Sequence, residues 1–174
     1  RRYLKAIEET EKPDFGIVFD SVWTVRAEKG IERPVFRLPL QTGNAQGKLW
    51  IDNFSTSEAP INQIPNTAIA TIKTISSEVA APFASQVKSL YDNYEFDDAD
   101  YRPAELEVSY TNGSSTVSLT TKVKGAQHGS VPHENRQDGA NPLVSLANFL
   151  ANLINRNQLS KNEIGRKTQF ISWE

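Results

Sequence analysis

The chain has 174 residues, of which 38% are hydrophobic and 23% charged, and its formal net charge is −2 at pH 7. This composition is typical of one globular domain, and with a negative net charge we do not expect a nucleic-acid partner held mainly by phosphate contacts. No apolar run approaches the roughly 20 residues of a membrane span, and the lack of cysteine excludes disulfides and thiolate metal sites.

The N-terminal run RRYLKAIEETEK is charged and carries Leu4 and Ile7 three positions apart, which is typical of a helix end or a linker. The chain has no methionine and no apolar targeting segment. We therefore interpret it as an internal fragment or a processed product, with the fragment favoured, and we expect a cytoplasmic protein without a membrane partner.

Short, partly alternating runs in the first third of the chain are typical of β-strands. They are PDFGIVFDSVWTV, PVFRLPL and KLWIDNF, at residues 13–25, 34–40 and 48–54. The next run, INQIPNTAIATIKTI, predicts a turn at Pro65 and then a strand through Ile69, Ile72 and Ile75.

The segment SSEVAAPFASQVKSLYDNY predicts a helix that Ser76 or Ser77 can cap. Its apolar residues recur on one face at helical spacing: Val79, Phe83, Val87, Leu90 and Tyr91. The acidic stretch EFDDADYRP that follows predicts a solvated loop.

Two alternating runs, ELEVSY and TVSLTTKVKG, flank Asn112-Gly113, a pair that supplies the positive φ angles of a tight hairpin turn. Farther on, Asp138 can cap a last helix with an apolar face at Leu143, Leu146, Phe149, Leu150, Leu153 and Ile154. The apolar residues of the tail, Phe170, Ile171 and Trp173, indicate a final strand or the start of one.

The order of strands, helix, hairpin and helix predicts an α+β fold. We expect a two-layer sandwich in which an antiparallel sheet carries two helices on one face.

The loop GAQHGSVP, after the hairpin, carries His128, one of two histidines in the chain. A single histidine at a strand end is most often a surface residue. Here, however, Gly125 and Gly129 permit close approach of the backbone and Pro132 stiffens the exit, so the loop is suited to present the imidazole. These residues leave open whether His128 packs, binds a metal or meets a substrate.

Catalytic motifs within the chain itself are weak. A zinc site needs three or four converging ligands, and only His128, His133 and Glu134 are near one another in the sequence, so we expect no metal site in this chain. Ser130 lies two residues from His128, but no G-x-S-x-G elbow accompanies it.

Three segments resemble the M-twenty family of zinc-dependent peptidases, which includes aminoacylases, carboxypeptidase G and carnosinase-like dipeptidases. GAQHGSVP followed by GANPLVSLANFL is similar to the family's histidine loop and leucine-rich helix. INQIPNTAIATI is similar to its Asn-x-Ile/Val-Pro turn before a strand, and PDFGIVFDSVWTVRAEKG to the segment by which the dipeptidases reach their inserted domain. The resemblance covers roughly residues 13–155.

The resemblance implies that this chain is a ferredoxin-like lid, or dimerisation, domain. Residues 1–30 would be the linker from the catalytic domain, and residues 31–174 the lid itself. It also implies a catalytic domain, absent from this chain, that binds two zinc ions through His, Asp and Glu. The implied partners are that domain, a small peptide substrate and, as in dimeric members, a second copy bound through the lid.

By the same resemblance, His128 would stabilise the negative charge that develops on the oxygen of the scissile carbonyl, and Asn62 would hold the substrate. The sequence departs from the family at Trp23-Thr24-Val25, where the dipeptidases have Phe-Pro-Val, and at Pro142, which replaces an alanine and should start the helix. The insertion HENRQD lengthens the loop after Pro132.

Some alternatives remain open. The Glu-Lys-Gly segment favours a dipeptidase over an aminoacylase, carboxypeptidase or deacetylase, and the family's carboxylate-binding arginine cannot be assigned to Arg156 or Arg166. A different class of protein, a non-enzymatic ferredoxin-like binding or dimerisation module, is the alternative function. RNA binding is disfavoured because the aromatic residues do not form an RNA-recognition motif and the net charge is negative.

Overall fold

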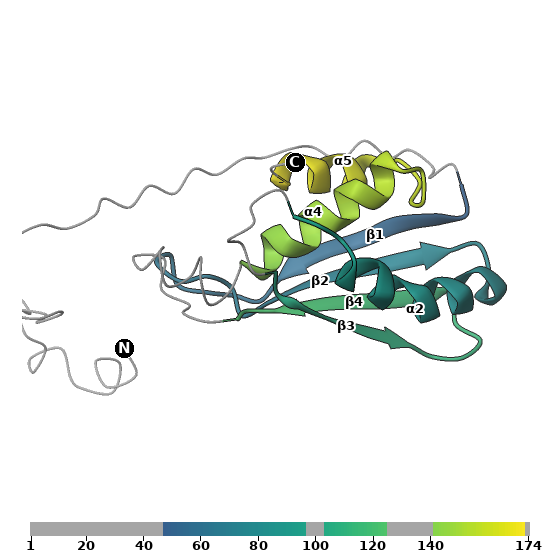
Figure 1. Ribbon diagram of the computed structural model, residues 1–174, viewed down its shortest axis with the longest axis horizontal. Helices are drawn as coiled ribbons and strands as arrows, with labels where there is room; N and C mark the ends of the chain where they lie inside the picture. Colours follow the sequence, from purple (N-terminus) through teal and green to yellow (C-terminus); the bar gives the residue numbers. More distant parts are fainter. Residues whose placement is uncertain (1–46, 97–102, 125–140, 173–174) are drawn as a thin grey trace, which may run out of the picture. The chain divides into compact units, whose positions relative to one another are not determined.

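The computed structural model describes residues 47–96, 103–124 and 141–172. Within them, four antiparallel strands form one sheet of order β1-β2-β4-β3, with three helices packed on it (Figure 1). The strands are β1 (Leu49–Thr56), β2 (Thr67–Thr74), β3 (Glu105–Tyr110) and β4 (Thr116–Lys122). The helices are α2 (Ser77–Asp92), α4 (Pro142–Asn155) and α5 (Glu163–Ile171). The predicted α+β class and antiparallel sheet are confirmed.

Only one face of the sheet is buried, because apolar residues alternate with polar ones along the two central strands. In β2, Ala68, Ala70 and Ile72 are fully buried, and the neighbouring β4 buries Val117 and Leu119. Helices α2 and α4 cover this face, and α5 lies beside α4 at the β1 edge (Figure 1). The sheet and helices are therefore two layers around one core, as predicted.

The central strand β4 separates β2 from β3, so the chain runs through β2, α2 and β3 as a split β-α-β unit with two parallel strands. This connectivity is typical of ferredoxin-like folds. The remaining place beside β2 is taken by β1, which precedes β2 in the chain and pairs with it antiparallel.

The hairpin between β3 and β4 is confirmed, but its turn differs from the prediction. The turn spans Thr111 to Ser114, with the Ser114 N–H donating to the Thr111 carbonyl over 2.9 Å. Gly113 has a φ of 82°, whereas among the described non-glycine residues only Asn157 has a positive φ. A positive φ at the second central residue alone requires glycine there and leaves Asn112 in an ordinary conformation.

Both predicted helices form, with differences at their ends. Ser76 is the N-cap of α2, and its side chain, together with the backbone N–H of Glu78 itself, lowers the pKa of the Glu78 carboxyl. Helix α4 begins at Pro142 as expected, but its cap is Asn141, whose side chain accepts a hydrogen bond from the Leu143 N–H over 3.0 Å. The prediction of Asp138 as the cap was wrong because the helix starts later.

The prediction of a C-terminal strand was wrong, since residues 163–171 form α5, a third helix. The Asn162 side chain starts it by accepting from the Gly165 N–H over 2.8 Å, while its amide group donates to the Ile51 carbonyl over 2.7 Å. Gly165 and Thr168 are buried; a Cβ on Gly165 would lie 3.0 Å from Ile154 Cδ1. Small residues on the buried side thus let the helix pack closely against α4.

Several predictions concern residues outside the described part of the chain. These are the strands at 13–25 and 34–40, the loop with Asp97 and Asp98, and the division at residues 30 and 31. Among the described helices, none has the length and apolar character needed to cross a membrane.

Candidate functional site

Asn62 lies at the tip of the loop that joins β1 to β2, here called the Asn62 loop (residues 57–66), and is exposed. The base of the loop is closed by two hydrogen bonds, from the Ser57 N–H to the Thr67 carbonyl and from the Thr67 N–H to the Ser57 hydroxyl, each 3.1 Å long. At the tip, the Gln63 N–H donates to the Pro60 carbonyl over 3.0 Å. A compact turn thus holds Asn62 where a ligand can reach it.

A groove of about 550 Å³ runs along the same loop. Its lining combines apolar side chains, two hydroxyls, one amide and one carboxylate: Thr56, Ser57, Glu58, Ala59, Pro60, Ile61, Gln63 and Pro65. Ile61 is 59% exposed and so presents apolar surface at the groove. The groove therefore offers apolar contact and hydrogen-bonding groups beside Asn62.

The segment that contains His128, residues 125–140, joins the described fold at the same end of the sheet. On its N-terminal side, the Val123 N–H donates to the Asn66 carbonyl over 2.8 Å, which ties the end of β4 to the Asn62 loop. On its C-terminal side, the Thr121 hydroxyl donates to the Pro142 carbonyl over 2.8 Å. Both anchors of the segment are therefore next to the start of β2.

His128 itself lies outside the described residues, as do Ser130, His133 and Glu134. The described ranges contain no group of three or more His, Cys, Asp or Glu residues that could hold a metal ion.

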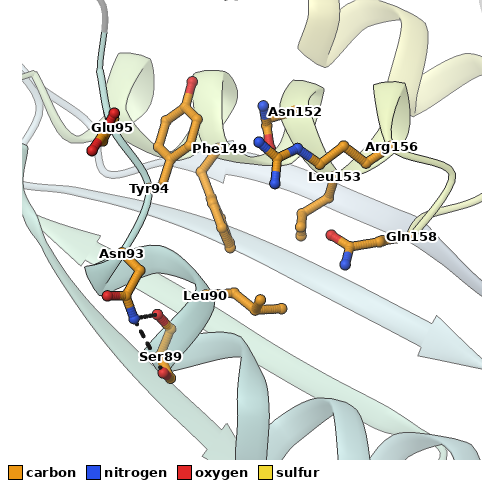
Figure 2. Close-up of a pocket in the computed structure, with 10 residues that line it drawn as sticks. All are labelled: Ser89, Leu90, Asn93, Tyr94, Glu95, Phe149, Asn152, Leu153, Arg156 and Gln158. Carbon is orange, nitrogen blue, oxygen red and sulfur yellow. Dashed lines mark hydrogen bonds between the residues drawn. The ribbon is translucent and has the colours of Figure 1, made fainter.

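A second hollow, which the sequence did not predict, lies between α2 and α4 on the helical side of the sheet (Figure 2). This interhelical groove has a volume of about 540 Å³. Its lining residues are Ser89, Leu90, Asn93, Tyr94, Glu95, Phe149, Asn152, Leu153, Arg156 and Gln158. Periodicity had placed Leu90, Phe149 and Leu153 in the core, and Phe149 and Leu153 are indeed buried, but Leu90 is 37% exposed.

The two arginines that the resemblance left open are in different surroundings. Arg166 on α5 pairs with Glu163 over 3.0 Å. Arg156, the C-cap residue of α4, lies at the interhelical groove. Neither lies on the Asn62 loop.

Comparison of the chain with models of known protein families gives no match, and comparison with curated proteins gives none either.

Proposed function

We propose that this chain is the lid domain of a zinc-dependent, dipeptidase-type metallohydrolase. In this proposal His128 and Asn62 act on a peptide substrate that is bound to a catalytic domain outside the chain. Two zinc ions in that domain would activate the water that attacks the peptide bond. The observation that carries the proposal is the hydrogen bond from the Val123 N–H to the Asn66 carbonyl.

That hydrogen bond brings the Asn62 loop next to the strand end from which the segment with His128 begins. Asn66 follows Asn62 by four positions, and Val123 precedes His128 by five. The segment 125–140 also returns to the fold at Pro142, whose carbonyl is held by Thr121 in the same strand end. In this proposal, a substrate at this end of the sheet would lie near the Asn62 loop. It would also lie near Val123 and Pro142, which flank the segment that contains His128.

Each residue has a role suited to its chemistry. An imidazole can donate a hydrogen bond whether neutral or protonated, so His128 can stabilise the oxygen of the scissile carbonyl as negative charge develops on it. The Asn62 amide can both donate and accept, which fixes the orientation of a peptide group without adding charge. The adjacent groove, with Ile61 and Pro60, would contact an apolar substrate side chain.

Replacing Asn62 with alanine in the full-length protein should raise KM for a dipeptide about fivefold and leave kcat nearly unchanged. The reason is that an orienting hydrogen bond contributes about 1 kcal/mol equally to the bound substrate and the transition state. Steady-state kinetics measures both constants. Asn155→Ala, an exposed asparagine at the far end of α4, is the matched control and should leave KM unchanged. An unaltered KM in Asn62→Ala would contradict the assignment.

A second function, dimerisation without catalysis, is favoured by one feature of the sheet. The outer edge of β1 is covered, because the Ser160 N–H donates to the Leu49 carbonyl over 2.7 Å and the Asn162 amide to the Ile51 carbonyl. In the described part of the chain, no such cover exists for β3, which is the other edge strand. Such a free edge can pair with another strand. A module that only dimerised would need neither His128 nor zinc, so kinetic measurements separate the two functions.

A further inference from the structure

The interhelical groove and the groove along the Asn62 loop share no lining residue. The Ser160 N–H is bonded to the carbonyl of Leu49, which pairs with Thr74 at the far end of β2. Because α4 starts beside the end of β4 at Pro142 and runs toward Ser160, its last turn is remote from the start of β2. The α4 wall of the groove is therefore separate from a substrate at Asn62.

The floor of the groove consists of apolar side chains that are packed into the core. Phe149 is 1% exposed and Leu153 2% exposed, and Phe149 packs edge-to-face on Tyr91 with ring centroids 5.1 Å apart. Leu90 lies on the α2 side of the groove and keeps 37% of its surface exposed (Figure 2). A ligand that covered Leu90 would remove apolar surface from water, which is favourable at about 25 cal/mol per Å².

The α4 side of the groove carries polar groups that are available to a ligand. Within the described residues, the side chains of Asn152, Arg156 and Gln158 form no hydrogen bond or ion pair with the protein. Asn152 and Arg156 are four positions apart on α4, so their side chains are neighbours on the helix surface, and Figure 2 shows the guanidinium beside the amide. One cation and two amides therefore border the apolar floor.

Free carbonyl groups at the C-terminal end of α4 would repel an anion, but most of them accept hydrogen bonds from backbone N–H groups. The Asn152 carbonyl accepts from the Arg156 N–H, and the Leu153 carbonyl accepts from the N–H groups of Gln158 and Leu159. The Ile154 carbonyl accepts from the Asn157 N–H over 3.0 Å. Arg156 thus supplies the charge on the α4 side of the groove, whereas Glu95, which also lines the groove, follows Tyr94 after the end of α2 (Figure 2).

From this arrangement we infer that the interhelical groove binds a small carboxylate with an apolar body. The carboxylate accepts hydrogen bonds from Arg156 and the amides of Asn152 and Gln158. The apolar body lies on Leu90, Phe149 and Leu153. Guanidinium groups suit carboxylates because they can donate two parallel hydrogen bonds.

The test uses three probes with the 174-residue chain in an NMR titration of its backbone amides: hexanoate, its neutral analogue hexanamide, and acetate. Hexanoate should shift the signals around Leu90, Phe149 and Leu153 and bind at least fivefold more tightly than either analogue. Hexanamide lacks the charge that Arg156 attracts, and acetate lacks the body that covers Leu90. Equal binding of hexanoate and hexanamide, or no hexanoate-induced shift at the groove, would overturn the inference.

Two substitutions of exposed residues refine the test. Arg156→Gln should weaken hexanoate about fivefold and leave hexanamide unchanged, since it removes the charge and keeps a polar side chain. Arg166→Gln, the matched control, changes an exposed arginine on α5 that pairs with Glu163, and it should alter neither affinity. Wild-type hexanoate affinity in Arg156→Gln, or an equal loss in Arg166→Gln, would overturn the inference.

Discussion

An alanine in place of His128 should lower kcat for peptide hydrolysis about a hundredfold in the full-length protein, while the bound zinc stays unchanged. A hydrogen-bond donor aimed at the developing oxyanion stabilises the transition state by about 3 kcal/mol, and the substrate carbonyl in the ground state gains much less from it. The loss should therefore appear in kcat and kcat/KM together, with little change in KM. This pattern differs from that expected for Asn62→Ala.

The matched control for this prediction is His133→Ala, the other histidine of the chain, which lies in the same segment and has no assigned role. It should retain kcat, and metal analysis of both variants should give the wild-type zinc content. If His128→Ala turned over substrate at the wild-type rate, the assigned role would be wrong. Zinc loss in that variant would indicate a metal ligand instead.

The largest effect on stability is expected for Phe149→Ala, which should lower the free energy of unfolding by about 3–5 kcal/mol. Phe149 is 1% exposed and contacts Tyr91 edge-to-face at an interplanar angle of 85°, and its ring centroid is 5.9 Å from that of Tyr94. Removing the ring leaves a cavity between α2, α4 and the sheet. It also removes the floor of the interhelical groove.

Urea denaturation of the wild type and the variant gives the difference in the free energy of unfolding. The comparison requires that this free energy falls with urea concentration at the same slope in both proteins. Phe170→Ala is the matched control. Because Phe170 is 59% exposed, its replacement should cost less than about 1 kcal/mol. A similarly small cost for Phe149→Ala would contradict the packing described for α4.

Much of the fold could be predicted because the apolar residues have a clear period. The isoleucines at 69, 72 and 75 indicated β2, although only Ile72 of the three is buried. Alternation in TVSLT identified β4, and helical spacing in LVSLANFLANLI identified α4, where every residue from Ser145 to Ala151 is buried. The hairpin was predicted from two alternating runs around Asn112-Gly113, and of this pair only Gly113 has the positive φ that other residues rarely adopt.

The errors arose where the period is weak or where contacts are long-range. Helix α5 has few large apolar residues on its buried side, since Gly165 and Thr168 fill it, and the exposed Phe170 gave a misleading strand signal. Its start depends on Asn162, which also reaches Ile51 in a strand more than a hundred residues away. No local pattern contains that contact.

The two candidate sites, at the Asn62 loop and at the interhelical groove, were predictable from the sequence to different extents. Asn62 was chosen from a short motif, and the structure places it in an exposed, hydrogen-bonded loop beside a groove. The interhelical groove was missed because its two walls come from separate helices. Leu90 and Leu153 both fitted a core pattern, and only the packed structure shows that α2 and α4 leave a hollow between them.

Zinc analysis of the natural full-length protein, combined with a dipeptidase assay, tests the central claim most directly. The proposal predicts two zinc ions per chain and hydrolysis of dipeptides that stops on chelation and returns when zinc is added back. A full-length protein that binds no zinc, or that hydrolyses no dipeptide or related amide with zinc bound, would contradict it.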